Sequence, residues 1–224
     1  MTDLTIDKLQ LAAASFSRAE SQHQEPSLFG IDNGKSIGTY LEQKFQQYLA
    51  LQSYDFTSGN AASGIDLPDL NIDIKVTSIR QPQSSCPFRS ARQKVYGLGY
   101  GLGYGLLLFV YEKNDDLQLK TANLKIKSTV LIEAHKTADF QLTRSLREIL
   151  RNDGNVDDIM ACLLDRLLPV DEISARALAE EIYKNPPQQG FLTISNALQW
   201  RLQYGRVLEK AGQESGLTQI YSDP

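Results

Sequence analysis

The chain has 224 residues, 42% of them hydrophobic and 22% charged, with a formal net charge of −4, which is the composition of a globular protein with enough apolar surface for a core. Its apolar runs are far shorter than the roughly 20 residues of a membrane span, and its acidic, polar N-terminus is not a secretory signal. The two cysteines lie far apart and form no CxxC pair, so the sequence argues against a disulfide framework or structural zinc and favours a cytoplasmic protein that does not bind a membrane.

The first part of the chain is predicted to form two helices and then a pair of strands. Residues 3–20 and 36–52 place apolar side chains at helical spacing, and a polar loop rich in turn-forming residues separates them. After a loop of Gly, Asn and Ser, residues 65–68 and 70–78 are predicted to be the strands of a hairpin, with the turn "PDLN" between them.

A tandem repeat, "YGLGYGLGYG" at residues 96–105, precedes the most apolar segment of the chain. No GK[ST] follows it and the spacing is not that of a nucleotide fingerprint, so a phosphate loop is the weaker interpretation. We expect instead a helix end that leads into a buried strand, with the tyrosines stacking on a neighbour. The elements predicted around the repeat are a helix at 90–95, strands at 106–112 and 124–134, and a helix at 140–152.

From about residue 156 the pattern becomes helical. Helices are predicted at 156–168, 174–183 and 194–212, followed by a strand at 217–221. This order resembles a winged-helix unit with residues 194–210 as the recognition helix, although a helical cap or a dimer arm accounts for it equally well. We therefore predict a core over residues 1–155 and a helical C-terminal subdomain over 156–224 that binds DNA or a partner subunit.

The segment "SGIDLPDLNIDIKVTS" carries charged residues within an apolar strand pattern. Burial of such charges costs several kcal/mol unless they are paired or bind a metal. Side chains alternate along a strand, so Asp73 and Lys75 are predicted to share a face, with Asp66 close by on the preceding strand. Two neighbouring carboxylates repel unless a cation lies between them, and Mg²⁺ suits such a pair. Asp69 is an alternative to Asp66, but we expect it in the turn.

Together with an earlier helix that carries Glu42, this arrangement resembles the PD-(D/E)XK nuclease superfamily and, within it, MutH and its restriction-enzyme relatives. There a glycine-containing helix with a glutamate precedes D-x6-E-x-K, and this chain has "GKSIGTYLE" and "DLPDLNIDIK". The resemblance covers residues 34–78 and departs from the pattern in having aspartate at position 73 and in the longer separation of Glu42 from Asp66.

The resemblance implies an α/β fold with a restriction-endonuclease-like core, in which helices flank a central mixed sheet. It implies that Asp66 and Asp73 are metal ligands, that Lys75 positions the attacking water, and that Glu42 is an auxiliary carboxylate at the edge of the site. For Glu42, a surface position paired with Lys44 or another lysine is a nearly equal alternative.

The basic residues gather in three stretches without acidic residues, at 74–111, 117–132 and 182–208, a pattern that suits a polyanion, although chance segregation remains the simpler alternative for any one stretch. Arg and Gln make paired hydrogen bonds to base edges, and Arg and Lys hold phosphates. The residues predicted to contact DNA, on or just after the strand with Lys75, are Thr77, Ser78, Arg80, Gln81, Gln83, Ser84, Ser85, Arg89, Arg92 and Lys94.

The sequence thus predicts a Mg²⁺-dependent type II restriction endonuclease that hydrolyses phosphodiester bonds in double-stranded DNA, with Mn²⁺ able to substitute. A palindromic target would call for a homodimer. One alternative is a MutH-like repair nickase that needs a partner protein. Another is a non-catalytic DNA-binding regulator that uses the C-terminal helices.

Overall fold

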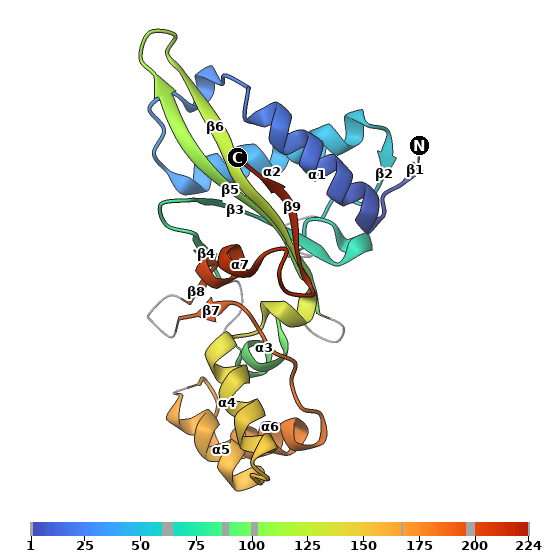
Figure 1. The fold of residues 1–224 in the computed structure, drawn as a ribbon, viewed down its shortest axis with the longest axis vertical. Helices are drawn as coiled ribbons and strands as arrows, with labels where there is room; N and C mark the ends of the chain where they lie inside the picture. The colour runs from blue at the N-terminus through green and yellow to red at the C-terminus, as the bar shows by residue number, and fades with distance from the viewer. Residues whose placement is uncertain are drawn as a thin grey trace. The chain divides into compact units, whose positions relative to one another are not determined.

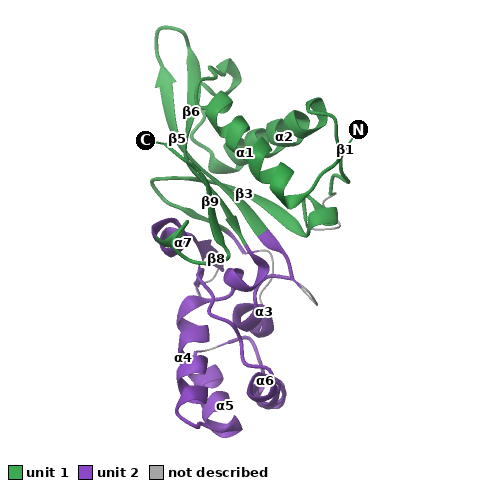
Figure 2. Ribbon diagram, turned by 45° about the vertical axis from the view of Figure 1, so that its right-hand side comes forward, with its two compact units in different colours: residues 1–84, 106–132, 210–224 green, residues 85–105, 133–209 purple. Residues whose placement is uncertain are grey.

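The computed structural model of the chain describes residues 2–59, 65–86, 90–99, 103–166, 168–195 and 200–223. It is an α/β protein with two compact units, which are interleaved along the chain (Figure 2). Unit 1 comprises Met1–Ser84, Leu106–Ile132 and Lys210–Pro224, and unit 2 comprises Ser85–Gly105 and Glu133–Glu209. The units divide the chain differently from the predicted single boundary at residue 155. Among the described helices, none combines the length and the apolar character that crossing a membrane requires.

The sheet of unit 1 has the strand order β3-β5-β6-β9 (Figure 1). Its strands are β3 (Ile72–Ser78), β5 (Gly105–Asp116), β6 (Thr121–Ile132) and β9 (Leu217–Ser222). The ladders of β5 with β6 and of β6 with β9 are antiparallel. Seven residues at the start of β5 are buried in succession, as expected of a strand in the centre of a sheet.

Two long helices of unit 1 pack on this sheet. They are α1 (Ile6–Glu20) and α2 (Gly34–Leu51), and α1 lies against β6 while α2 lies against β3. Each begins at a side chain that accepts a hydrogen bond from the first turn, Thr5 for α1 and Asn33 for α2. Phe16 of α1, Phe45 of α2 and Phe109 of β5 meet with ring centroids 5.1–5.7 Å apart, which packs both helices against β5, the strand next to β3 in the sheet.

The remaining elements of unit 1 are short. β1 (Thr2–Asp3) and β2 (Tyr54–Asp55) form a parallel pair, and two 3₁₀ turns occupy Pro26–Leu28 and Pro68–Leu70. β4 (Gln83–Ser85) lies at the boundary between the units. The predicted hairpin is present in reduced form, because residues 65–68 contribute a single bridge, from Leu67 to Ile72, instead of a strand.

Unit 2 is mainly helical. Its helices are α3 (Ala91–Tyr96), α4 (Phe140–Arg151), α5 (Val156–Asp165), α6 (Glu172–Lys184) and the start of α7 (Gly205–Lys210), with a 3₁₀ turn at Ala134–Thr137. Leu142, Leu146, Ile159, Leu163 and Ile182 are among the buried residues that join α4, α5 and α6. A small antiparallel pair, β7 (Thr193–Ile194) and β8 (Arg201–Gln203), completes the unit.

The predicted long helix at residues 194–212 is wrong, and with it the recognition helix of a winged-helix unit. Trp200, Leu202 and Tyr204 are buried while Gln203 between them is exposed, so this segment has the period of a strand and not of a helix. The helix that follows starts only at Gly205. The predicted terminal strand exists as β9, but it pairs with β6 in the sheet of unit 1, so it is not a wing beside the helices.

Candidate functional site

β3 brings Asp73 and Lys75 together. Both side chains point to the same face of the strand, and Lys75 Nζ lies 2.5 Å from Asp73 Oδ2. Ile72 and Ile74 belong to the hydrophobic core of unit 1. Asp73 is only 4% exposed, whereas Lys75 is partly exposed. The alternation predicted from the sequence therefore places the carboxylate of Asp73 and the ammonium of Lys75 side by side at the border between core and solvent.

A tight turn places Asp66 beside this pair. Leu67 and Ile72 exchange two backbone hydrogen bonds of 2.9 and 3.2 Å, and Asn71 closes the turn in the left-handed conformation, at φ 51° and ψ 45°, which asparagine tolerates better than most residues. The amide of Ile74 donates a hydrogen bond of 2.8 Å to Asp66 Oδ2. The carboxylate of Asp66 is thus held against the backbone of β3, next to Asp73.

The electrostatics of Asp73 show how closely these groups are placed. Burial, together with the neighbouring Asp66, raises the pKa of Asp73 to about 7 against the opposing effect of Lys75. The two carboxyl groups therefore lie close together beside the ammonium of Lys75.

Glu42 of α2 lies in the same electrostatic environment. Burial, with smaller contributions from Asp66 and Asp73, raises its pKa to about 7 against the opposing effect of Lys75. The predicted alternative, a pair with Lys44, is not what forms, because Lys44 Nζ lies 2.7 Å from Glu20 Oε2. The structure thus brings all four candidate catalytic residues together: Glu42, Asp66, Asp73 and Lys75.

The donor set suits a hard divalent cation that keeps part of its own hydration shell. No group of three His, Cys, Asp or Glu side chains in the described part of the chain is arranged to hold a metal ion. Asp66 and Asp73 nevertheless supply paired carboxylate oxygens, and a bound cation would offset the repulsion between the two carboxylates. Mg²⁺ is commonly bound in this way, by one or two carboxylates with waters and phosphate oxygens completing its octahedron.

Asp69, the alternative to Asp66, has another role in the structure. Its Oδ2 accepts a hydrogen bond of 2.6 Å from the amide of Thr57, and Gly59 donates a hydrogen bond of 2.8 Å to the carbonyl of Asp66. Asp69 thereby ties the segment before the site to the turn that carries Asp66. These supporting groups were not predicted from the sequence, although an Asp and an Asn within a four-residue turn are the usual signal for them.

The predicted DNA-contact residues of unit 1 divide into two kinds. Thr77 is buried and its hydroxyl bonds to the backbone of Gln81 and Gln83. Ser78 accepts a hydrogen bond of 3.3 Å from the amide of Arg80, and Arg80 and Gln81 are exposed. The turn after β3 therefore presents two of the predicted contacts, Arg80 and Gln81, to solvent, while Thr77 and Ser78 hydrogen-bond to its backbone. Gln83 and Ser84 are half-buried.

In unit 2 the predicted contacts have partners within the unit. Arg92 Nη2 lies 2.6 Å from Glu181 Oε1, and Lys94 is buried with its ammonium 5.2 Å from the centre of the Trp200 ring. Burial lowers the pKa of Lys94. Ser85 accepts a hydrogen bond from Arg201, and Arg89 lies outside the described residues. Contact of Arg92 or Lys94 with a phosphate would thus require these interactions to break.

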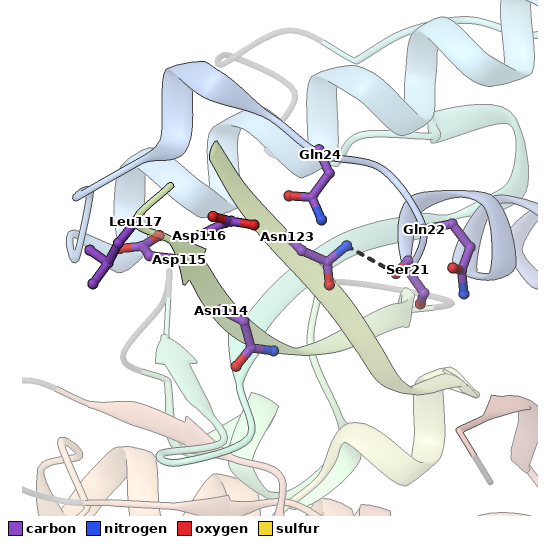
Figure 3. Close-up of a pocket in the computed structure, with 8 residues that line it drawn as sticks. All are labelled: Ser21, Gln22, Gln24, Asn114, Asp115, Asp116, Leu117 and Asn123. Atoms are coloured by element: carbon purple, nitrogen blue, oxygen red, sulfur yellow. Dashed lines mark hydrogen bonds between the residues drawn. The ribbon is translucent and has the colours of Figure 1, made fainter. Parts of the chain in front are cut away.

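A cavity of about 570 Å³ lies elsewhere in unit 1, beside the turn of the β5–β6 hairpin (Figure 3). None of the four candidate catalytic residues lines it. Its walls are polar, and the lining residues are Ser21, Gln22, Gln24, Asn114, Asp115, Asp116, Leu117 and Asn123. In the same sheet, Lys125 and Lys127 of the second basic stretch both pair with Asp223.

Nearly the whole chain resembles a known family. Residues 3–219 match the model of the family described as type II restriction enzyme NspV. A curated relative from Nostoc sp. (strain ATCC 29411 / PCC 7524), named type II restriction enzyme NspV, is 61% identical over 221 residues, which are 99% of this chain and 98% of the relative. No solved structure matches significantly. The matched range extends over both compact units.

Proposed function

The chain belongs to the family of the type II restriction enzyme NspV, a family of site-specific endonucleases, and we propose that it hydrolyses phosphodiester bonds of double-stranded DNA at the site formed by Asp66, Asp73 and Lys75. The observation that carries this assignment is the contact of two carboxyls beside a lysine that is 2.5 Å from one of them. Such a group is costly to keep in a fold unless it performs chemistry.

Each residue has a role in this proposal. Asp66 and Asp73 hold Mg²⁺, which, when bound, lowers the pKa of a coordinated water and screens the charge of the scissile phosphate. Lys75, which lies beside these carboxylates, orients the attacking water and balances negative charge that develops on the phosphate oxygens. Glu42, on the facing helix, accepts a proton or a hydrogen bond at the edge of the site.

The fold proposed for this chemistry is a restriction-endonuclease-like core in unit 1. In support, the helix with Glu42 packs on the strand that carries Asp73 and Lys75, and the turn before that strand positions Asp66. A homodimer is proposed for the enzyme, because two copies related by a two-fold axis place one such site on each strand of a palindromic target.

The proposal is tested by incubating the purified protein alone with plasmid DNA of known sequence, with Mg²⁺, Mn²⁺ or a chelator. We expect discrete double-strand fragments with either metal, ends that map to one short sequence, and intact DNA in the chelator. An Asp66→Asn variant serves as the control for a contaminating nuclease. Nicking, or no cleavage until a partner protein is added, would favour the MutH-like alternative. Sequence-specific binding without cleavage under every condition would favour the regulator.

A further inference from the structure

The catalytic strand carries a third polar residue on the same face, and this residue is built into the backbone of the next turn. Asp73, Lys75 and Thr77 alternate along β3, so their side chains share a face. Thr77 is 4% exposed. Its Oγ1 lies 3.0 Å from both the amide nitrogen and the carbonyl oxygen of Gln83, and 3.1 Å from the carbonyl oxygen of Gln81.

The turn at residues 78–82 is fixed at both ends by further hydrogen bonds. At its start, the amide of Ile79 donates to the carbonyl of Tyr111 on β5 at 2.8 Å. Within it, the amide of Gln81 donates to the carbonyl of Ser78 at 3.3 Å, and the amide of Arg80 donates to Ser78 Oγ at 3.3 Å. The Thr77 hydroxyl then ties the end of the turn back to β3. The backbone of the 78–82 turn is therefore set by the strand that holds the candidate catalytic residues.

The side chains that this turn displays are suited to DNA. Arg80 and Gln81 are exposed, and within the described residues neither side chain makes a hydrogen bond or an ion pair. Arginine binds guanine and glutamine binds adenine through paired hydrogen bonds in the major groove. A strand rises about 3.3 Å per residue, so Thr77 lies about 7 Å beyond Lys75 along β3. That distance corresponds to about two nucleotide steps of about 3.4 Å each.

We propose that Thr77 is a positioning residue for sequence recognition: its buried hydroxyl fixes the 78–82 turn so that Arg80 and Gln81 contact bases beside the scissile phosphate. The proposal rests on the endonuclease function given above. It adds that Arg80 and Gln81 contact the bases and that Thr77 positions them. Thr77 itself does not contact DNA in this arrangement, because its oxygen is buried and already bonded to the backbone. Recognition is thereby coupled to catalysis through one strand, since Lys75 and Thr77 are two residues apart.

The test compares Thr77→Val, which keeps the shape of the side chain and removes the hydroxyl, with Thr77→Ser, which keeps the hydroxyl. The substrates are a duplex with the site mapped for the unaltered enzyme and duplexes with single-base replacements in it. For Thr77→Val we expect KM to rise about 10-fold while kcat changes less than about 3-fold, with increased relative cleavage of the altered duplexes. Thr77→Ser should stay close to the unaltered enzyme in both respects.

A second set of variants separates positioning from a purely structural role. Arg80→Ala and Gln81→Ala are surface changes that should each raise KM and relax selectivity at one base position. In the Arg80→Ala/Gln81→Ala background, adding Thr77→Val should change KM and selectivity little, because its effect acts through those two side chains. Circular dichroism and thermal unfolding of each variant establish that it is folded.

Wild-type KM and selectivity in Thr77→Val would overturn the proposal. So would an equal effect of Thr77→Val in the wild-type and the Arg80→Ala/Gln81→Ala backgrounds. If Thr77→Val does not fold, Arg80→Ala and Gln81→Ala decide. Wild-type KM and selectivity in both of these variants refute the proposal, whereas a raised KM and relaxed selectivity support it. In each case the unaltered protein still cuts the mapped duplex, whereas failure of the endonuclease function itself would appear as no cleavage by the unaltered protein.

Discussion

Lys75 Nζ and Asp73 Oδ2 lie 2.5 Å apart on one face of β3, with 21% of the lysine side chain and 5% of the aspartate side chain exposed. The ion pair thus spans the border between the core of unit 1 and solvent. Because Asp73 is buried and Lys75 is partly exposed, their ion pair holds the lysine ammonium on the solvent side of the site. This is the geometry required of a group that orients water at a scissile phosphate.

Lys75→Met is therefore expected to lower the cleavage rate at least about 100-fold while DNA binding persists. The variant should remain folded at neutral pH, because the pKa of Asp73 is already raised to about 7 and rises further without the lysine, so that Asp73 becomes neutral. Single-turnover cleavage and gel-shift binding of the same duplex measure the two effects. Cleavage at the wild-type rate would remove Lys75 from the mechanism.

The choice between Asp66 and Asp69 as metal ligand can be settled with matched amides. Asp66→Asn is expected to abolish cleavage, because an amide is a weak ligand for Mg²⁺. Asp69→Asn should retain most activity, since an amide oxygen can still accept the hydrogen bond that Thr57 donates to Asp69. Asp69→Ala should lower the free energy of unfolding by about 1 kcal/mol through loss of that bond. The reverse order of activities would make Asp69 the ligand.

Glu42→Gln tests the auxiliary role of the helix carboxylate. The pKa of Glu42 is raised to about 7 by burial and by Asp66 and Asp73, so a neutral amide of the same shape should be tolerated in the fold. We expect the cleavage rate to fall about 10-fold, much less than for Asp66→Asn, with a flatter dependence of rate on pH between 6 and 8. An unchanged rate and pH profile would return Glu42 to a structural role.

Much of the candidate site follows from local sequence rules. The alternation of β3 places Asp73 and Lys75 together, and the turn residues between Asp66 and Asp73 bring their carboxyls into contact. The hydrogen bond from the Ile74 amide to Asp66 Oδ2 was not predicted, because it depends on where the backbone of the turn meets β3. The burial of Lys94 against Trp200 was also missed, because it depends on packing between residues that are distant in sequence.

The fold was predicted with the same pattern of success and failure. The two N-terminal helices and the strands β3 and β6 show apolar periodicity, β5 is a continuous apolar run, and the structure confirms all of them. Residues 200–204 were assigned to a helix, although Trp200, Leu202 and Tyr204 alternate as in a strand. The alternation is too short to stand out within a longer apolar segment, and the pairing with Thr193 and Ile194, which makes it a strand, depends on contacts outside the segment.

Stability without metal should depend on pH in a direction set by Asp73. Its pKa is 3.8 in the unfolded reference and about 7 in the folded protein, so between these values the folded state holds a proton that the unfolded chain has released. The free energy of unfolding therefore falls as pH rises through this window. Asp73→Asn removes this titration and is expected to raise Tm by about 3 °C at pH 8 in a chelator, with little change at pH 4.5.

The same variant tests metal binding. Excess Mg²⁺ at pH 8 should raise the Tm of the unaltered protein, because the cation binds the folded state only, and should leave the Tm of Asp73→Asn unchanged. Thermal unfolding at several Mg²⁺ concentrations measures both. Equal shifts in the two proteins would place the cation elsewhere.

The C-terminal strand β9 is paired as a strand of the unit 1 sheet and not as the wing of a winged-helix unit. β9 pairs with β6, Leu217 is 1% exposed, and the Gln219 side chain donates a hydrogen bond of 3.0 Å to Ser128 Oγ. Deleting residues 216–224 leaves the edge of β6 unpaired and exposes core side chains, so Tm should fall by at least about 10 °C and the purified protein should aggregate.

Asp223→Asn is the matched control for that deletion, because it removes only the ion pairs of Asp223 with Lys125 and Lys127 and keeps the strand. Pairs at the surface contribute little, so its Tm should stay close to that of the unaltered chain and its cleavage rate should be retained. A wing would behave differently: the truncated chain would keep its Tm and its catalytic sheet, and would lose affinity for DNA. Because β9 completes the same sheet that carries β3, we expect stability and cleavage to be lost together.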